Sequence, residues 1–288
     1  MIRFSYYPGC SLGSSTDFYD RSLRKVLTFY GIELKELDDW SCCGASAAPT
    51  VNEGLSIVLS ARNIALAERS GLHLVAPCSA CYARTKAAAR KIVEDNDTRR
   101  MVNEALAPLS CRGNIEVKNV IEVFRDFVGL ERIAGSVSHD LRGLKAVAYY
   151  GCLLTRIMGI SPSDDTEDPT GMDIILKALG VTVVPWQYKT ECCGASSTIT
   201  NGDVTARLSG RLAEKAARAG AQAIVTTCPL CQLNLDLLPY LGSGIPPVPV
   251  FFLTEIFELA LFGETSGGAR HLVDTRTIEQ GVRPLQEP

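Results

Sequence analysis

The residues of this 288-residue chain with the clearest chemical potential are its eleven cysteines, because ten of them form two sets with one arrangement. Each set has a single cysteine, then an adjacent pair followed by glycine, then a Cys-x-x-Cys motif. The first set is Cys10, Cys42, Cys43, Cys78 and Cys81, and the second is Cys152, Cys192, Cys193, Cys228 and Cys231. Thiolates are soft ligands that suit zinc, copper(I) and iron–sulfur clusters. The pattern therefore predicts two metal sites.

The spacing of the two sets indicates an internal duplication. The adjacent pair and the Cys-x-x-Cys motif are 35 positions apart in both sets, and the sets are offset by 150 residues. The five residues 42–46 recur unchanged as 192–196, whereas the interval before the pair differs, at 32 and 40 positions. A repeat of this kind makes half of the chain the structural unit.

Three kinds of site compete for each cysteine set. A structural zinc ion takes four ligands in a tetrahedron, and adjacent cysteines are poorly placed to chelate one such ion. Disulfides or unliganded core cysteines are the simplest alternative, but the shared spacing of ten cysteines disfavours them. Iron–sulfur clusters are favoured, and since ordinary cubane clusters use four cysteines, a set of five indicates another cluster type.

Other residues near or outside the sets have simpler interpretations. Gly44 and Gly194 follow the cysteine pairs, where they would allow a sharp turn against a bulky inorganic core. Cys111 has no counterpart in the second half, so we do not expect it to be a ligand. The three histidines, His73, His139 and His271, occupy no repeated position, and His73 is predicted to pack within a strand.

Each half of the chain alternates strand and helix patterns, which predicts two parallel α/β lobes. In the first half strands are expected at 2–7, 32–37 and 73–76, and helices at 17–30 and 55–69. In the second half strands are expected at 146–150, 181–184 and 223–226, and helices at 172–179 and 208–219. Segments 95–109 and 117–130 would connect the lobes or pack on the first. Single cysteines and Cys-x-x-Cys motifs directly follow predicted strands, so each set would converge at one sheet edge.

The composition is typical of a globular protein with a buried core, with 46% hydrophobic and 21% charged residues. The net charge of −3 gives no reason to expect nucleic acid or an anionic membrane as a partner. No segment reaches the roughly 20 apolar residues of a membrane span. The first ten residues lack the basic and apolar regions of a secretory signal, so a cytoplasmic location is expected.

The motif resembles the cysteine-rich CCG domain, and two copies in one chain resemble the B subunit of heterodisulfide reductase, over residues 1 to about 262. The resemblance implies two Rossmann-like lobes related by a pseudo-twofold axis, with 1–140 and 141–262 as cluster-binding lobes and 263–288 as a polar tail that is disordered or lies along a partner. Each cysteine set would bind a noncubane [4Fe-4S] cluster. A disulfide would lie between the clusters and receive one electron at each sulfur.

The resemblance also implies partners and leaves an alternative. Electrons would arrive from the ferredoxin-like iron–sulfur C subunit of such a reductase, which its flavin-containing A subunit would supply. The disulfide would be that of coenzyme M and coenzyme B (CoM-S-S-CoB), or a related small or protein-bound one. Methanogenic members often carry histidines near the cysteine that opens the second set, where this chain has tyrosines. The alternative is a non-catalytic electron-relay subunit of a larger flavin and iron–sulfur complex. Candidate substrate contacts are Ser46, Ser196, Tyr82, Arg156 and Lys189.

Overall fold

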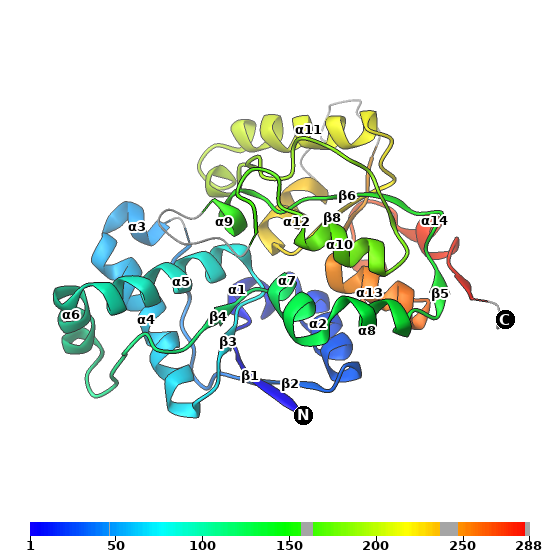
Figure 1. Ribbon diagram of the computed structural model, residues 1–288. Coiled ribbons are helices and arrows are strands. Elements are labelled where there is room, and N and C mark those ends of the chain that lie inside the picture. The colour runs from blue at the N-terminus through cyan, green and yellow to red at the C-terminus, as the bar shows by residue number, and fades with distance from the viewer. Residues whose placement is uncertain (46, 157–163, 237–246, 286–288) are drawn as a thin grey trace.

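Two parallel sheets of four strands each organise the computed structural model, which describes residues 1–45, 47–156, 164–236 and 247–285 (Figure 1). The first sheet has the order β2-β1-β3-β4 and the second the order β7-β6-β8-β9. The strands of the first sheet are β1 (Ile2–Tyr6), β2 (Ile32–Glu36), β3 (Leu74–Val75) and β4 (Val117–Lys118). Those of the second are β6 (Lys145–Ala148), β7 (Thr182–Val183), β8 (Ala223–Thr226) and β9 (Val250–Phe252). Because strands equivalent by the duplication hold equivalent places, the predicted fold of two duplicated α/β lobes is confirmed.

The helices follow the strands in the same succession in both lobes. The first lobe contains α1 (Gly9–Leu12), α2 (Asp17–Phe29), α3 (Ala47–Val51), α4 (Glu53–Ser70), α5 (Ser79–Glu94), α6 (Asn96–Leu106), α7 (Val120–Val123), the π-helical turn η1 (Phe124–Val128) and α8 (Leu130–Ser136). The second contains α9 (Cys152–Thr155), α10 (Gly171–Ala178), η2 (Ala195–Ser197), α11 (Gly202–Arg218), α12 (Pro229–Asp236) and α13 (Leu253–Phe262).

Local sequence signals explain where several of these helices begin and end. The side chain of Asn52 caps α4 by accepting a hydrogen bond from the backbone N–H of Leu55, and Asn201 caps α11 in the same way through Val204. The glycine after α4, Gly71, has the left-handed conformation that often ends a helix. Equivalent helices of the two lobes thus have the same asparagine N-terminal cap.

Two helices that begin in the Cys-x-x-Cys motifs, α5 and α12, were not predicted from the sequence. The buried side of α5 consists largely of alanines such as Ala80, Ala83 and Ala88, so it lacks the stripe of large apolar residues that marks an amphipathic helix. The helix expected at 95–109 is shorter, because α6 ends at Leu106.

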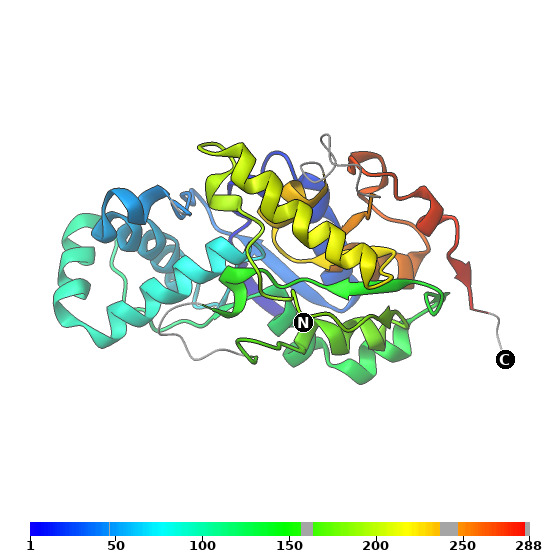
Figure 2. The ribbon, with the colours of Figure 1, turned by 90° about the horizontal axis from the view of Figure 1, so that it is seen from above.

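The two lobes share one core instead of meeting through polar surfaces. Tyr19 of α2 stacks on Phe252 at the end of β9 with ring centroids 3.9 Å apart, and Phe124 of η1 stacks on Phe257 of α13 at 4.1 Å. Both views place the first turn of α5 beside α9 of the other lobe (Figures 1 and 2). The lobes are therefore held at a fixed distance by buried aromatic rings.

The segment after α13 was expected to be a disordered tail or to lie along a partner, but its described part packs on the protein. It contains η4 (Gly268–Arg270), α14 (Arg276–Glu279) and β10 (Arg283–Pro284), and β10 pairs antiparallel with β5 (His139–Asp140). The carboxylate of Asp236 accepts the backbone N–H of Leu272 at 2.8 Å, and His271 Nε2 lies 2.8 Å from Glu255 Oε1. Because these contacts use backbone groups and single side chains, they leave no periodic pattern in the sequence.

The buried pair of His271 and Glu255 predicts that this docked segment loosens at alkaline pH. Burial lowers the pKa of His271, but the hydrogen bond and charge of Glu255 outweigh it, so the net pKa is raised. The stabilisation is therefore complete below the unfolded value near 6.5 and is lost as pH rises through the folded pKa. Protection of the C-terminal segment from hydrogen exchange, compared at a pH below 6.5 and at an alkaline pH, should be lower at the alkaline pH. His271→Gln should remove that dependence and His73→Gln, at an exposed site, should keep it; equal protection at both pH values would contradict the prediction.

Candidate metal centres

The cysteines gather where the parallel strands end, as the sequence predicts. Cys10 follows β1, and Cys78 follows β3 and forms the N-terminal cap of α5. In the second lobe Cys152 follows β6 and begins α9, and Cys228 follows β8. The carboxyl edge of each sheet thereby brings together residues that are far apart in the sequence.

One close contact between thiols occurs in both sets, and it joins residues that are equivalent by the duplication. Cys43 Sγ lies 3.5 Å from Cys81 Sγ, and Cys193 Sγ lies 3.4 Å from Cys231 Sγ. In both loops the glycine after the pair donates its backbone N–H to the first sulfur of the pair, at 3.4 Å for Cys42 and 3.3 Å for Cys192. Such an N–H group stabilises negative charge on the sulfur that accepts it.

Glycines hold the backbone close to the thiols at two positions of each repeat. Gly44 and Gly194 have φ of +76° and +82°, which confirms the predicted sharp turn after each cysteine pair. The glycines before the first cysteines also have positive φ and were not predicted. A Cβ on Gly9 would lie 2.9 Å from Cys81 Sγ, and one on Gly151 would lie 3.2 Å from Cys231 Sγ. Only glycine allows the end of the first strand to approach the Cys-x-x-Cys motif so closely.

The two sets adjoin at the boundary between the lobes. The pKa of the Cys228 thiol is lowered by hydrogen bonds from Cys231 and from Cys78, which belongs to the other lobe. Beside them the hydroxyl of Tyr19 donates a hydrogen bond to the carbonyl of Thr227 at 3.1 Å. Cys78 and Cys228 are equivalent by the duplication, and equivalent residues meet where a pseudo-twofold axis passes.

The surroundings of the two sets differ. In the first set Cys10 and Cys42 are exposed, whereas Cys43, Cys78 and Cys81 are buried. All five cysteines of the second set line a cavity of about 430 Å³, which we call the interlobe cavity. The first lobe closes this cavity with Pro49, Thr50, Ser79, Ala80 and Arg84. The second set therefore lines a cavity that is partly open to solvent, while two thiols of the first set are exposed at the surface.

Crowding keeps the thiols of one set from ionising together. Hydrogen bonds from Cys42 and Cys81 lower the pKa of Cys43 to about 3, and a hydrogen bond from Cys152 lowers that of Cys192 to about 6. The donating neighbours Cys42 and Cys152 have raised pKa values for the same reason. A site with all five thiolates ionised therefore needs a compensating positive charge, which iron or another metal provides.

The donor set fits a polynuclear cluster. Within the parts of the chain that the structure describes, no three histidine, cysteine or acidic side chains converge as the ligands of a single metal ion would. The thiols of the second set instead surround a space, and every donor is a soft sulfur. The assignment of the ten cysteines as ligands stays a prediction that these positions support.

Cys111 lies apart from both sets, in the loop before β4. Burial and then the charge of Glu68 raise its pKa to about 12. Its backbone is held by Asn103, whose Oδ1 accepts the N–H of Cys111 at 2.7 Å and whose Nδ2 donates to its carbonyl at 3.3 Å. A protonated, buried thiol of this kind behaves as a small apolar side chain.

The five residues proposed as substrate contacts differ in where they lie and in what they contact. Ser196 lines the interlobe cavity, and Ser46 lies outside the described residues. The hydroxyl of Tyr82 accepts a hydrogen bond from Lys86 at 2.6 Å. Arg156 pairs with Glu167 at 2.8 Å, and Lys189 Nζ lies 3.0 Å from Asp173 Oδ1. The last three are thus engaged by neighbouring side chains, and none is among the described residues of the cavity wall.

Arg84 is a charged residue of the cavity wall that was not predicted from the sequence. It lies on α5, three positions after the Cys-x-x-Cys motif, and Asn234 holds the equivalent position on α12. Arg84 Nε donates to the carbonyl of Ala45 at 2.8 Å, and Asn234 Nδ2 donates to that of Cys193 at 3.4 Å. Both side chains hold a cysteine-containing loop by a hydrogen bond to its backbone. Aligning the two halves of the sequence at their offset of 150 residues would have revealed that arginine replaces asparagine at this position.

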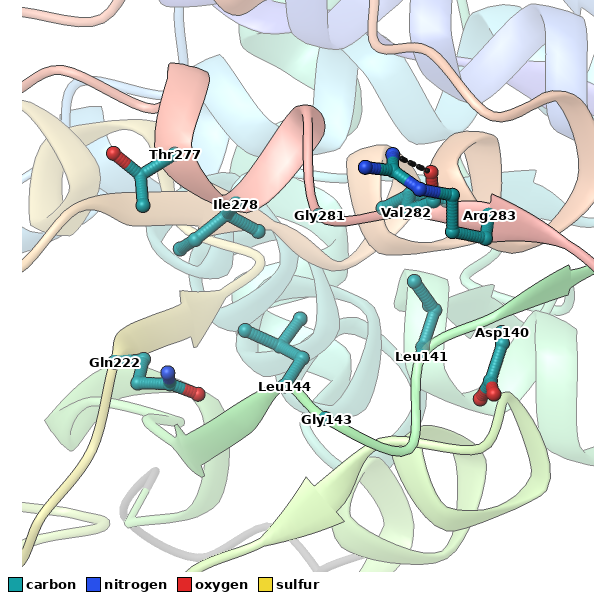
Figure 3. A pocket seen from close by; sticks show the side chains of 10 residues that line it. All are labelled: Asp140, Leu141, Gly143, Leu144, Gln222, Thr277, Ile278, Gly281, Val282 and Arg283. Carbon is teal, nitrogen blue, oxygen red and sulfur yellow. Dashed lines mark hydrogen bonds between the residues drawn. The ribbon is translucent and has the colours of Figure 1, made fainter.

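A second cavity, of about 340 Å³, lies at the opposite edge of the second sheet, between the start of β6 and the C-terminal segment (Figure 3). It contains no cysteine among its described residues. Its charged side chains are engaged elsewhere, since Asp140 pairs with Arg142 and Arg283 donates to the carbonyl of Val282 at 3.0 Å. This cavity is therefore remote from the thiol chemistry.

No helix within the described residues combines the length and the apolar character that a membrane crossing requires. This finding agrees with the lack of a long apolar segment in the sequence.

Known proteins similar to this chain include components of redox complexes. An 8-methylmenaquinol:fumarate reductase membrane anchor subunit from Wolinella succinogenes is 32% identical over 90% of this chain and 92% of its own length. A protein from Archaeoglobus profundus, named as similar to the B subunit of heterodisulfide reductase, is 28% identical over 91% of both chains. The B subunit of the ferredoxin/F420H2-dependent CoB-CoM heterodisulfide reductase from Methanosarcina acetivorans is 27% identical over 91% of this chain and 90% of its own length.

A solved structure shares the fold. A hypothetical protein from Helicobacter pylori superposes with a TM-score of 0.77 at 15% sequence identity, covering 95% of this chain. This chain spans about half of that protein, 52% of its length. The cysteine-rich domain CCG matches residues 4–86 and 146–236, which together make up more than half of the chain and contain both cysteine sets. The duplicated thiol sites and these matches show that the chain belongs to the CCG cysteine-rich domain family, of which it carries two copies.

Proposed function

We propose that this chain is an iron–sulfur subunit that reduces a disulfide bound in the interlobe cavity. Cys152, Cys192, Cys193, Cys228 and Cys231 would hold one noncubane [4Fe-4S] cluster there, and Cys10, Cys42, Cys43, Cys78 and Cys81 would hold the other. When bound, the clusters would supply single electrons. The observation that carries the proposal is a cavity lined by all five thiols of one set and closed by the other lobe.

The cavity wall is suited to a substrate with a carbon chain on each side of its sulfurs. Apart from the cysteines, much of the wall is apolar, with Pro49, Ala80, Leu153 and Leu230. Apolar walls orient such chains and displace water from them. Reduction of one disulfide consumes two electrons and two protons and releases two thiols, so a supply of electrons from outside the chain is needed.

The electrons from outside the chain would enter at the first cysteine set. Its thiols Cys10 and Cys42 are exposed, whereas the corresponding thiols Cys152 and Cys192 are partly covered. We therefore place the docking site of an electron-donating partner over the first set. This partner would be the ferredoxin-like C subunit of a reductase complex, itself supplied by the flavin-containing A subunit. The names of the relatives support a partner of some kind, because they describe components of larger reductases.

A second candidate function is electron relay between a quinol and a partner enzyme. The relative that is 32% identical is named as part of an 8-methylmenaquinol:fumarate reductase. Three exposed apolar side chains also adjoin the cavity residues along the chain: Val51 follows Thr50, Leu153 lines the cavity itself, and Ile199 lies three positions after Ser196. Such a rim would favour the approach of an apolar quinol.

Spectroscopy of the purified protein separates the two functions. If the chain reduces disulfides, adding a small thiol to the oxidised protein should change the electron paramagnetic resonance signal of one cluster, because the thiol is the product of the reaction. A menaquinol analogue should then leave the clusters oxidised. Unchanged signals with every thiol, together with reduction by the quinol, would overturn the first function in favour of the relay.

A further inference from the structure

The two walls of the interlobe cavity differ in charge. Among the described residues that line it, Arg84 is the one basic side chain, and no aspartate or glutamate is present. The second lobe contributes its five cysteines together with small, apolar or uncharged residues. A positive group contributed by the first lobe therefore faces the thiols of the second.

Part of the guanidinium of Arg84 is available to a ligand. Its Nε donates to the carbonyl of Ala45, and no carboxylate lies within ion-pair distance among the residues that the structure describes. The neighbouring basic residues of the same helix are paired, Lys86 with Glu122 and Arg90 with Glu94. An arginine without a carboxylate at a cavity wall is suited to binding an anion through its remaining N–H groups.

Ser79 provides an independent observation at the same wall. It is the first residue of the 16-residue helix α5, it is 2% exposed, and its hydroxyl has no hydrogen-bond partner in the described structure. A buried hydroxyl without a partner is uncommon in folded proteins, and a ligand is one way to satisfy it. The N-terminal end of α5 adds a partial positive charge beside it.

The duplication shows that these groups are not required for holding a cluster. The positions equivalent to Ser79 and Arg84 are Pro229 and Asn234, which bring neither a hydroxyl nor a charge. Asn234 still secures its own cysteine loop. The positive charge and the hydroxyl on the first-lobe wall are thus features that the second copy of the repeat lacks.

We infer that Arg84 and Ser79 bind an anionic end group, such as a carboxylate, on the substrate in the interlobe cavity. The inference rests on the proposed function and narrows its substrate to acidic low-molecular-weight disulfides. Arg84 would act as a specificity-determining residue that orients the substrate by its charged end, leaving the disulfide to face the thiol-lined wall.

Calorimetric binding to the oxidised, cluster-loaded protein tests this without turnover. The probes are 3,3′-dithiodipropionate, which is anionic, and 2-hydroxyethyl disulfide, which is neutral. The wild-type protein should prefer the anion, and Arg84→Gln should weaken its binding by about 10- to 100-fold while leaving the neutral probe unaffected. Arg84→Lys should retain part of the preference, and Ser79→Ala should lower it less than Arg84→Gln does.

Arg90→Gln is the matched control, because it removes a positive charge from the exposed side of the same helix. It should bind both probes as the wild-type protein does. Iron analysis of every variant shows whether both clusters remain. An unchanged preference in Arg84→Gln with full iron would overturn the inference, as would a changed cluster potential without a changed preference.

Suberate, in which methylene groups replace the two sulfurs of dithiodipropionate, separates this inference from the proposed function. Suberate binding that depends on Arg84, in a protein that reduces no disulfide, would uphold the anion site and refute the proposed function. Reduction of both disulfides with equal efficiency, with no suberate binding, would uphold the proposed function and refute the anion site.

Discussion

Replacing Cys193 by alanine is expected to remove the second cluster and leave the first, so that iron falls from about eight to about four atoms per chain. Cys193 is buried, and its sulfur lies 3.4 Å from that of Cys231, at the centre of the second set. The equivalent contact between Cys43 and Cys81 does not depend on it. Iron and sulfide analysis, together with the resonance signals of the two clusters, measures the result.

Cys111→Ala is the control for this prediction. Cys111 is buried like Cys193, but it lies apart from both sets. This variant should keep all of its iron, with at most a moderate loss of stability from the small cavity that it creates. A Cys193→Ala protein with both clusters intact would falsify the ligand assignment of the second set.

Lys189→Met is expected to destabilise the protein by about 3 kcal/mol and to lower its melting temperature by about 10 °C. Lys189 is 7% exposed, and its ammonium lies 3.0 Å from the carboxylate of buried Asp173. Methionine leaves this carboxylate without its cation. The backbone carbonyl of Lys189 accepts the N–H groups of Tyr150 and Gly151, directly before Cys152. Because loss of the ion pair would loosen this segment, the iron of the second set should fall as well.

Two further variants identify the cause of that loss. Lys177→Met removes an exposed lysine from the helix that carries Asp173 and should unfold like the wild-type protein. The double variant Lys189→Met with Asp173→Asn removes the unpaired charge and should recover most of the lost stability, as double-mutant analysis would reveal. Equal stability of Lys189→Met and the wild-type protein would show that the pair has no structural role.

The elements that could be predicted are those whose burial follows a regular pattern in the sequence. The helix expected at 17–30 is α2, whose buried side includes Phe18, Leu23 and Val26, and the strand expected at 223–226 is β8. Both have large or β-branched apolar residues at the spacing of their structure. These patterns also predicted that Cys78 and Cys228 directly follow strands. The carboxyl edge of each sheet was therefore predicted correctly as the place where the cysteines lie.

What could not be predicted depends on contacts between distant parts of the chain. Helix α5 buries mainly alanines, so its hydrophobic periodicity is weak and the helix was not predicted. The position of Arg84 at the cavity wall was missed for the same reason. Lys189 was one candidate substrate contact, but its partner Asp173 becomes its neighbour only through folding. The docking of residues around His271 rests on the buried acids Glu255 and Asp236, whose burial has no signature in a single sequence.

The first lobe closes the cavity of the second set, and this arrangement has a consequence for the origin of the protein. A chain with only one copy of the repeat would hold its five thiols but would lack the opposing wall that contains Ser79 and Arg84. Two such chains would have to associate as a homodimer, with Cys78 of each meeting at the symmetry axis. In that ancestor both cavities would have been identical. Fusion of the two copies would have released one half to change, so that, under the proposed function, one side of the molecule would specialise in receiving electrons and the other in selecting what is reduced.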